Sequence, residues 1–361
     1  MTANEPMRDK RLSLVSSKFW PRDSTPLRSA DSGALSACVD IAFNRVKESP
    51  TVFSHEATFF PLGFPLRIIS NSSSVLEAAE ESWGQFEQVF THIPLELHIG
   101  VKEDVDEEEG VPLAPIHSVN GHLLVNAADV DNFFVADLLK GRAIGWVTET
   151  TSVSTMYLRY HFIEAATLSM LATLRAVPLH AACIRTGESG VLLCGESGAG
   201  KSSLAYAGSR AGWTFICDDA CYLPLERADR LVIGNCHQVR FRPSAAELFP
   251  EIRDYPITPR AAGKPSIEVH TSEWPTLSIS GNTVVNHIVF LNRNLGDRQE
   301  LVRLPSSEVW PWFSQHLLVP ELRPIHDAAL TRLLTAEIYE LRYQDLGWAI
   351  ERIDQLAARG Q

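Results

Sequence analysis

Residues 179–223 contain the pattern that decides the fold. They read LHAACIRTGESGVLLCGESGAGKSSLAYAGSRAGWTFICDDACYL, and within them residues 195–202, GESGAGKS, match the pattern G-x-x-x-x-G-K-[ST]. Glycines at these positions let successive backbone N–H groups turn inward and form a concave site for an anion. In such a loop Lys201 reaches the β- and γ-phosphates of a nucleotide, and the Ser202 hydroxyl binds Mg²⁺. The pattern therefore predicts a nucleotide-binding loop.

The residues on both sides of this loop support that interpretation. Residues 190–194, GVLLC, form a short apolar run that is typical of a buried strand. Residues 202–207, SSLAYA, indicate a helix that starts near Lys201, ends near Gly212 and points the positive end of its dipole at the loop. The alternative is an ordinary glycine-rich turn between a strand and a helix. The residues predicted to bind the nucleotide are Gly195, Glu196, Ser197, Gly198, Ala199, Gly200, Lys201, Ser202 and Ser203.

A pair of carboxylates follows the next predicted strand. This strand, residues 213–217, ends at Asp218 and Asp219, and ligands of parallel α/β sheets bind at the carboxyl ends of the strands. One carboxylate in this place would lie near Mg²⁺, and the other would take the proton from an attacking hydroxyl. A solvated turn is the alternative. His180, where a predicted strand over residues 181–184 begins, is on its own more typical of a structural histidine.

Taken together, these residues resemble the catalytic domain of the HPr kinase/phosphorylase family of P-loop kinases, from about residue 177 to the end of the chain. In that family a His-Gly or His-Ala opens a strand, G-[DE]-S-G-x-G-K-S follows, and a double Asp closes the next strand. The resemblance implies that ATP and Mg²⁺ are bound and that Asp219 is the catalytic base. It also implies that Asp218 and Ser202 lie nearest the metal ion and that His180 pairs with the aspartates.

The chain departs from the family pattern at three places, one of which is Phe241-Arg242-Pro243-Ser244, where the family signature continues with glycines. The residue after the Walker serine is Ser203, where the family typically has Glu. The segment Gln238-Val239-Arg240 stands where the family has Glu-Ile-Arg, and an amide is a weaker Mg²⁺ ligand than a carboxylate. We therefore expect the nucleotide chemistry to be kept, without assuming HPr as the acceptor or a reverse phosphorylase reaction. Arg240, or Lys264 in a basic turn, is expected to neutralise the transferred charge.

Composition excludes several classes of function. A net charge of −12 argues against general nucleic-acid binding, which requires a basic surface. No run of eighteen apolar residues is present, so no membrane span is predicted. The first ten residues lack the apolar segment of a secretory signal, and the six cysteines have no zinc-site spacing, so free thiols in the cytoplasm are expected.

The length of 361 residues predicts two domains. We expect an α/β fold in which an HPr kinase/carboxykinase-like P-loop domain, residues 177–361, follows a smaller α+β domain, residues 51–156. Residues 1–50 are polar and are expected to be partly disordered, with a short helix over 40–46. Residues 157–176 are expected to form a connecting helix with Arg159, His161 and Glu164 on its surface. Further expectations are a hairpin around Asn120-Gly121 and helices over 75–90, 306–313, 327–339 and 346–358.

The leading functional hypothesis is an ATP-dependent kinase that phosphorylates a hydroxyl, seryl in the first instance, of a small molecule, peptide or protein. Its expected catalytic residues are His180, Lys201, Asp218, Asp219 and Arg240. The rival hypothesis is a nucleotide-binding regulatory or scaffolding module in which Gln238 has weakened metal binding. A decarboxylating carboxykinase is disfavoured because no second metal-binding His/Lys set is evident near the loop. No nucleic-acid or membrane partner is expected, and the sequence leaves an oligomer open.

Overall fold

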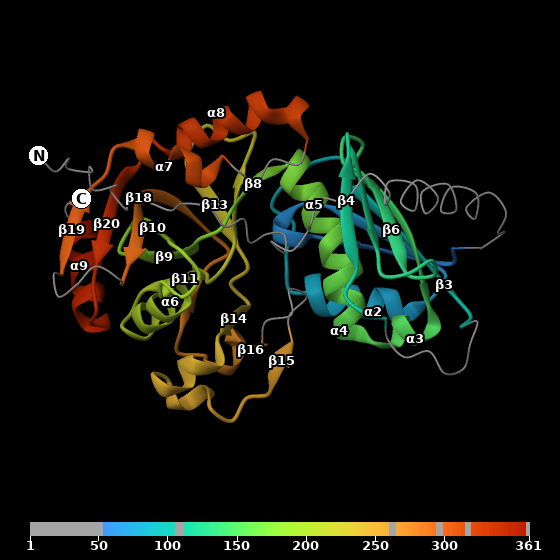
Figure 1. The fold of residues 1–361 in the computed structure, drawn as a ribbon, viewed down its shortest axis with the longest axis horizontal. Helices are drawn as coiled ribbons and strands as arrows, with labels where there is room; N and C mark the ends of the chain where they lie inside the picture. The colour runs from blue at the N-terminus through green and yellow to red at the C-terminus, as the bar shows by residue number, and fades with distance from the viewer. Residues whose placement is uncertain (1–52, 105–111, 260–264, 294–298, 315–318, 359–361) are drawn as a thin grey trace, which may run out of the picture.

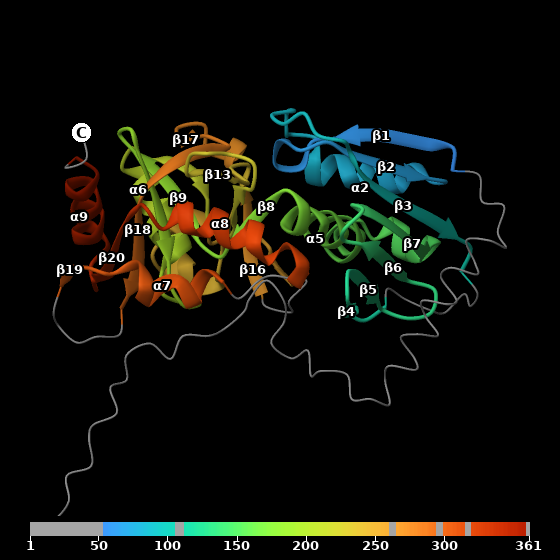
Figure 2. The same cartoon turned by 90° about the horizontal axis from the view of Figure 1, so that it is seen from above.

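The computed structural model describes residues 53–104, 112–259, 265–293, 299–314 and 319–358. The helix predicted over 40–46, most of the acidic run 103–109 and the basic turn that contains Lys264 lie outside these residues. The chain forms two halves, each built on its own β-sheet (Figure 1). Seen from above, the halves lie side by side, with helix α5 (Ala165–Leu174) and strand β8 (Ala176–Leu179) between them (Figure 2).

The N-terminal half contains a sheet with the strand order β1-β2-β3-β7-β6-β5-β4. Its strands are β1 (His55–Phe59), β2 (Leu66–Ser70), β3 (Leu95–Lys102), β4 (Ile116–Asn120), β5 (Leu123–Ala127), β6 (Phe133–Asp137) and β7 (Arg142–Thr148). Strands β2, β3 and β7 are parallel, whereas the other neighbours are antiparallel. The hairpin predicted around Asn120-Gly121 is confirmed: Asn120 pairs with Leu123, and Gly121 has the positive φ of 59° that a tight turn requires.

Helical segments pack on this sheet and bury its apolar face. They are the 3₁₀ turn η1 (Pro61–Gly63), α2 (Ser73–Trp83), α3 (Glu149–Val153), α4 (Thr155–Leu158), the π-helical segment η2 (Arg159–Glu164) and α5. The helix predicted over 75–90 is shorter than expected and ends at Trp83. The chain after Gly84 turns back instead, because the N–H groups of Val89 and Phe90 donate to the Gly63 carbonyl and the Phe90 ring stacks on Phe64.

The C-terminal half contains a larger mixed sheet. Its main strand order is β17-β11-β9-β10-β18-β13-β12-β8, and β20 joins β18 and β19. Besides β8, its strands are β9 (Ala182–Thr186), β10 (Ser189–Cys194), β11 (Thr214–Cys217), β12 (Cys221–Pro224), β13 (Leu231–Gly234), β17 (Ser278–Ile279), β18 (Asn282–Asn292), β19 (Glu300–Arg303) and β20 (Glu337–Arg342). A separate small sheet has the order β14-β16-β15, formed by β14 (Gln238–Phe241), β15 (Ile257–Pro259) and β16 (Pro265–His270).

The sheet is mixed, whereas the prediction that Asp218 and Asp219 lie at a ligand-binding edge rests on a parallel sheet. Strand β9 lies between β10 and β11 and is antiparallel to both. As a result β10 and β11 run in the same direction, and both end at the same edge of the sheet. The loop after β10 and the aspartates after β11 are therefore still brought to one edge.

The described helical elements of this half are α6 (Lys201–Arg210), α7 (Ser306–Phe313), α8 (Arg323–Leu333), α9 (Leu346–Ala358) and the 3₁₀ turns η3 (Pro243–Glu247), η4 (Pro250–Ile252), η5 (Thr271–Glu273) and η6 (Pro320–Leu322). The predictions for 306–313 and 346–358 are confirmed. The prediction for 327–339 is wrong at its end, since Glu337–Arg342 is strand β20, fixed by parallel pairing with β18. None of the helices in the described part of the chain is both long and apolar enough to cross a membrane.

The two halves share part of their hydrophobic core. The core beneath the N-terminal sheet includes Phe162 and Met170 and continues into Tyr222 and Ile233 of the second half. Two further clusters belong to the C-terminal half, one centred on residues such as Leu193 and Leu204 and the other on residues such as Leu192 and Ile288. Because successive residues of β10 point to opposite faces, Leu192 and Leu193 belong to different clusters.

Candidate active site

The loop of residues 195–200 connects β10 to α6 and has the backbone that its glycines predict. Gly195, Gly198 and Gly200 have φ values of 145°, 91° and 96°, in the region that favours glycine. A Cβ added to Gly200 would lie 2.6 Å from the Tyr343 hydroxyl oxygen, and this hydroxyl donates to the Ala199 carbonyl at 3.1 Å. The loop thus has the form of a tight backbone turn held from outside by Tyr343.

Lys201 begins α6, and its side chain folds back under the loop. Its Nζ donates to the Gly195 carbonyl at 2.8 Å and contacts the Glu196 carbonyl at 3.4 Å, and the residue is only 7% exposed. Burial lowers the pKa of the Lys201 ammonium, and the nearby Asp219 carboxylate opposes this shift. The Lys201 ammonium therefore lies beneath the loop backbone, where it can bind an anion together with the loop N–H groups.

The first turn of α6 connects the loop to the aspartates. The Ser202 hydroxyl lies 3.4 Å from the main-chain carbonyl of Asp218, and Ser203 follows it on the helix. Helix α6 has ten residues, so the unpaired N–H groups and the dipole of its N-terminus add to the positive potential at the loop.

Asp218 and Asp219 have different environments. Asp218 is 5% exposed, and its Oδ2 accepts the backbone N–H of Arg240 at 2.8 Å. Asp219 has a side chain that is 41% exposed, and its Oδ1 lies 3.7 Å from His180 Nδ1. The structure therefore places one carboxylate in a fixed, buried position and the other in an accessible one beside an imidazole. The roles assigned to them stay predictions.

Arg240 is held away from solvent by an ion pair that the sequence did not predict. Its Nε donates to Glu268 Oε2 at 2.7 Å, and its guanidinium lies 5.4 Å from the centre of the Tyr160 ring. Burial opposes the charge of Arg240, but Glu268 and then Glu164 outweigh it and raise the pKa of the guanidinium. The same Glu268 oxygen accepts the Tyr160 hydroxyl at 2.9 Å, so Arg240 belongs to a network that joins the two halves.

Gln238 is part of this network. With its amide nitrogen turned toward Glu268, it donates to Glu268 Oε1 at 3.1 Å and accepts from Arg240 Nη2 at 2.7 Å. The amide that replaces the family's carboxylate therefore binds both members of an ion pair. A carboxylate in its place would lie beside Glu268 and repel it, which gives a physical reason for an amide here.

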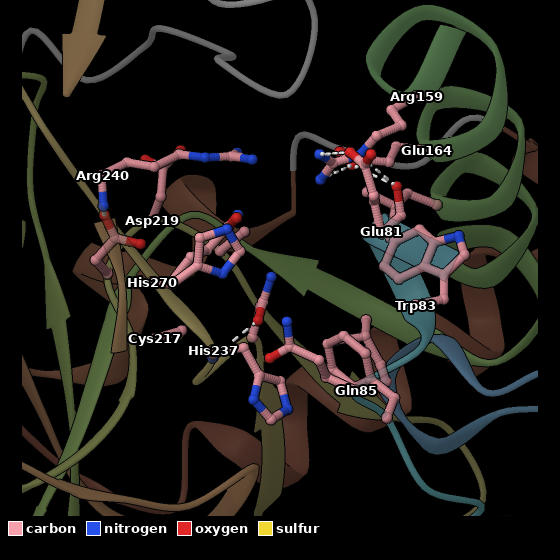
Figure 3. A pocket seen from close by; sticks show the side chains of 18 of the residues that line it. Glu81, Trp83, Gln85, Arg159, Glu164, Cys217, Asp219, His237, Arg240 and His270 are labelled. Atoms are coloured by element: carbon pink, nitrogen blue, oxygen red, sulfur yellow. Dashed lines mark hydrogen bonds and ion pairs between the residues drawn. The ribbon is translucent and has the colours of Figure 1, made fainter. Parts of the chain in front are cut away.

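A cavity opens beside the aspartates, between the two halves. We call the residues on its C-terminal side the loop wall and those on its N-terminal side the helix wall. The loop wall comprises Cys217, Asp218, Asp219, Ala220, Tyr222, Asn235, His237, Gln238, Arg240 and His270. The helix wall comprises Leu62, Glu81, Ser82, Trp83, Gln85, Phe86, Arg159, Glu164 and Leu168. Figure 3 shows Glu81, Arg159 and Glu164 gathered on one side of the cavity, opposite Asp219, Arg240 and His270.

The prediction that Arg159 and Glu164 are ordinary surface residues is wrong. Their side chains are 13% and 16% exposed, and both line the cavity. They lie at the two ends of the π-helical segment η2, and such segments inside α-helices are frequent at functional sites. No sequence pattern indicates this segment, because its apolar residues keep ordinary helical spacing.

Other residues that contact the loop were not predicted from the sequence. The Arg242 guanidinium donates to the Ser197 hydroxyl, and the Arg293 guanidinium lies 5.7 Å from the centre of the Tyr343 ring, close to Gly200. Arg242 could have been predicted from the sequence, because it lies two residues after the predicted catalytic residue Arg240. Arg293 and Tyr343 reach the loop only through the pairing of β18 with β20.

The described residues fit a magnesium–nucleotide ligand. The hydroxyl of Ser202 and the carboxylate of Asp218 are hard oxygen donors beside a loop that would bind phosphates. Among the residues that the structure describes, no group of three or more His, Cys, Asp or Glu is arranged to hold a metal ion. Mg²⁺ is usually bound by one or two protein carboxylates together with the phosphates of its substrate.

The cysteines around the site are buried thiols. Cys183, Cys194, Cys217, Cys221 and Cys236 are all free and buried, and burial raises the pKa of Cys194 to about 12. A thiol with a raised pKa is a poor nucleophile at neutral pH. These residues therefore serve as small apolar side chains that pack the strands around the aspartates.

Comparison with known proteins gives a weak structural likeness. No family model and no curated protein sequence matches the chain. Among solved structures, the Hpr(Ser) kinase/phosphatase from Coxiella burnetii aligns with 14% sequence identity and a TM-score of 0.30, over 51% of this chain and 93% of that chain. A likeness at this level does not indicate a function.

Proposed function

We propose that the chain is an ATP-dependent phosphotransferase that phosphorylates a hydroxyl group, with seryl-type hydroxyls as the first candidates. One observation carries the proposal: the accessible Asp219 carboxylate, paired with His180 at 3.7 Å, lies at the same sheet edge as the Gly195–Gly200 loop and Lys201. This arrangement brings an anion-binding loop and a proton acceptor to one sheet edge, where the proton acceptor lines a cavity.

Each residue has a task in the proposed mechanism. When bound, ATP supplies the phosphoryl group and Mg²⁺, held by Ser202 and Asp218, offsets the charge of its phosphates. The loop N–H groups and Lys201 bind and orient the phosphates. Asp219 accepts the proton of the acceptor hydroxyl, and His180 orients this carboxylate. Arg240, fixed by Glu268 and Gln238, stabilises negative charge near Asp218 without having to be ordered during the reaction.

A second candidate is a nucleotide-binding regulatory module that does not transfer phosphate. The observation that favours it is Gln238, whose amide is engaged by Glu268 and Arg240 where the resembling family has a metal-side carboxylate. In this case the loop would still bind a nucleotide, while metal binding would be too weak to support transfer. Both candidates predict nucleotide binding, but only the phosphotransferase predicts turnover.

The test is transfer from γ-labelled ATP to a panel of hydroxyl compounds and seryl peptides, measured for wild type and Asp219→Asn. This substitution keeps the shape of the side chain and removes the proton acceptor. Transfer should fall by about two to four orders of magnitude, the usual contribution of a general base, while nucleotide binding is kept. His180→Ala should show a smaller fall in transfer, since the imidazole would act through Asp219.

Asp254→Asn is the matched control, because Asp254 is an exposed carboxylate in the same half and does not line the cavity. It should leave transfer unchanged. Equal turnover of wild type and Asp219→Asn would exclude Asp219 as the base. Nucleotide binding by wild type without transfer to any acceptor would favour the regulatory module.

A further inference from the structure

The cavity beside Asp219 is small and is closed on one side by the N-terminal half. Its volume is about 110 Å³, well below the roughly 300–1,000 Å³ of pockets that hold drug-sized ligands. The halves share a continuous core that includes Phe162, Met170 and Tyr222, so the N-terminal half is packed firmly against the cavity. A cavity of this size fits a small molecule beside Asp219.

The helix wall is a built arrangement of polar side chains. Arg159 lies between two carboxylates, with Nη1 at 3.1 Å from Glu81 Oε2 and Nη2 at 3.6 Å from Glu164 Oε1. Ser82 accepts from Arg159 Nε at 2.9 Å and donates to Glu164 Oε1 at 3.0 Å. These contacts fix Oε1 of Glu164.

The wall is assembled by an irregular helix. The π-helical segment η2 places both Arg159 and Glu164 on the cavity, although they are five residues apart. In an α-helix residues five apart point in directions that differ by about 140°, because each residue turns the chain by about 100°. The wider π turn brings them nearer to one face, which indicates that this wall depends on the irregularity of the helix.

The cavity has an excess of negative charge. Four carboxylates line it, namely Glu81, Glu164, Asp218 and Asp219, against the two guanidinium groups of Arg159 and Arg240. Arg240 is already paired with Glu268 outside this set. Burial, and then His270, lower the pKa of His237, so that imidazole adds no positive charge at neutral pH. On the helix wall the single guanidinium of Arg159 pairs with both Glu81 and Glu164, so this wall keeps one negative charge in excess.

We propose that this cavity binds the phosphoryl acceptor and that the acceptor is a small alcohol carrying a protonated primary amine. Its ammonium group would bind Glu164 and Glu81 on the helix wall, and its hydroxyl would face Asp219 on the loop wall. The ring faces of Trp83 and Phe86 would cover its carbon atoms. The inference rests on the proposed function. In the reaction the hydroxyl oxygen bonds to the γ-phosphorus of ATP, the bond to the β-phosphate oxygen breaks to release ADP, and the hydroxyl proton passes to Asp219.

The experiment compares acceptors of equal size and different charge. Ethanolamine and L-serine would be tested against ethylene glycol and glycerate, both as acceptors and by calorimetry in the presence of ADP and Mg²⁺. For wild type, the amine compounds should bind at least about tenfold more tightly than ethylene glycol. If serine and ethanolamine bind equally tightly, the cavity recognises only the amine and the hydroxyl. If serine binds more tightly, the cavity also recognises its carboxylate.

The variants then locate the amine site. Glu164→Gln keeps an oxygen that can accept the Ser82 hydroxyl, so the fold should be preserved, yet it removes the charge. It should weaken ethanolamine binding about tenfold or more and raise KM more than it lowers kcat, without changing nucleotide affinity. Glu81→Gln should have a smaller effect in the same direction, because Glu81 is the more exposed carboxylate of the two. Glu77→Gln is the control, since Glu77 lies one turn earlier on α2, is exposed and does not line the cavity.

Two results would overturn the inference while leaving the proposed function intact: equal binding of ethanolamine and ethylene glycol by wild type, or equal behaviour of Glu164→Gln and Glu77→Gln. If the protein binds no nucleotide, the proposed function fails by itself. Calorimetry with ethanolamine still decides the inference in that case, because loss of binding in Glu164→Gln supports the amine site and absence of binding by wild type rejects it.

Discussion

The loop wall and the helix wall face each other across one cavity, but they are made in different ways. The centre of the loop wall is the contiguous segment 217–220, which lies at the same sheet edge as the Gly195–Gly200 loop, whose backbone is set by glycines with positive φ. The charged side chains of the helix wall come from α2 and η2, with Glu81 and Arg159 separated by 78 residues in the chain. A backbone site has a sequence pattern because only certain residues allow its conformation, whereas an assembly of ion pairs has no fixed spacing.

The largest expected effect tests the nucleotide-binding loop beside the loop wall. Lys201→Ala should abolish the increase in thermal stability on adding ATP and Mg²⁺, because the cation under the loop is lost. At a nucleotide concentration of about 100 times Kd, the stabilisation that disappears should be about 2.7 kcal/mol. Differential scanning fluorimetry with ATP, ADP or GTP measures it.

The control for this variant is Lys140→Ala, since Lys140 is an exposed lysine in a turn of the N-terminal half. It should retain the full shift. Absence of any shift in wild type with all three nucleotides would refute nucleotide binding by the loop beside the loop wall.

A smaller effect tests the connection between the walls. Tyr160→Phe removes the hydroxyl that donates to Glu268 at 2.9 Å, while its ring remains beside Arg240. The free energy of unfolding should fall by about 1.5 kcal/mol, because the lost hydrogen bond has a charged acceptor. Transfer activity should also fall, since Glu268 holds Arg240.

Tyr157→Phe provides the comparison, because the Tyr157 hydroxyl donates to the Leu113 carbonyl within the N-terminal half. It should lower the free energy of unfolding, as measured by urea denaturation, without lowering transfer. If both variants changed transfer equally, the Tyr160–Glu268 contact would have no special role in joining the walls.

The smallest effect concerns pH. Burial acts to raise the pKa of Glu268, but Arg240 outweighs it, followed by the hydrogen bond from Tyr160, and the pKa of the carboxyl is lowered from its ordinary value of 4.5. The folded protein therefore releases this proton more readily than the unfolded chain. The stability from Glu268 is fully present above about pH 4.5 and is lost as pH falls through the lower folded pKa.

Urea denaturation of wild type and Glu268→Gln between pH 7 and pH 3 measures this effect. The difference in free energy of unfolding should be constant above about pH 4.5 and should then shrink by at most about 1.4 kcal/mol per pH unit, the limit for one proton. A difference that stays constant down to pH 3 would show that Glu268 is not held as a carboxylate by Arg240.

Much of the local structure could be predicted from the sequence. The strand before the loop was placed at residues 190–194 and is Ser189–Cys194, and the helix after it starts at Lys201 as expected. Both segments have local causes, namely an apolar run and a glycine-rich turn. The end of the helix predicted over 327–339 was wrong because Glu337–Arg342 pairs with β18, and this partner lies far away in sequence.

The sequence by itself determined the loop, the lysine beneath it and the aspartates after the next strand, because the conformation of glycine and the alternation of apolar residues act over a few neighbouring positions. Only the tertiary structure decided what faces them. The order of the strands brings Asp219 to His180 and Tyr343 to the loop, and the π turn of η2 together with α2 forms the helix wall. These contacts depend on pairing and packing between segments that are distant in the chain, and no local pattern encodes their partners.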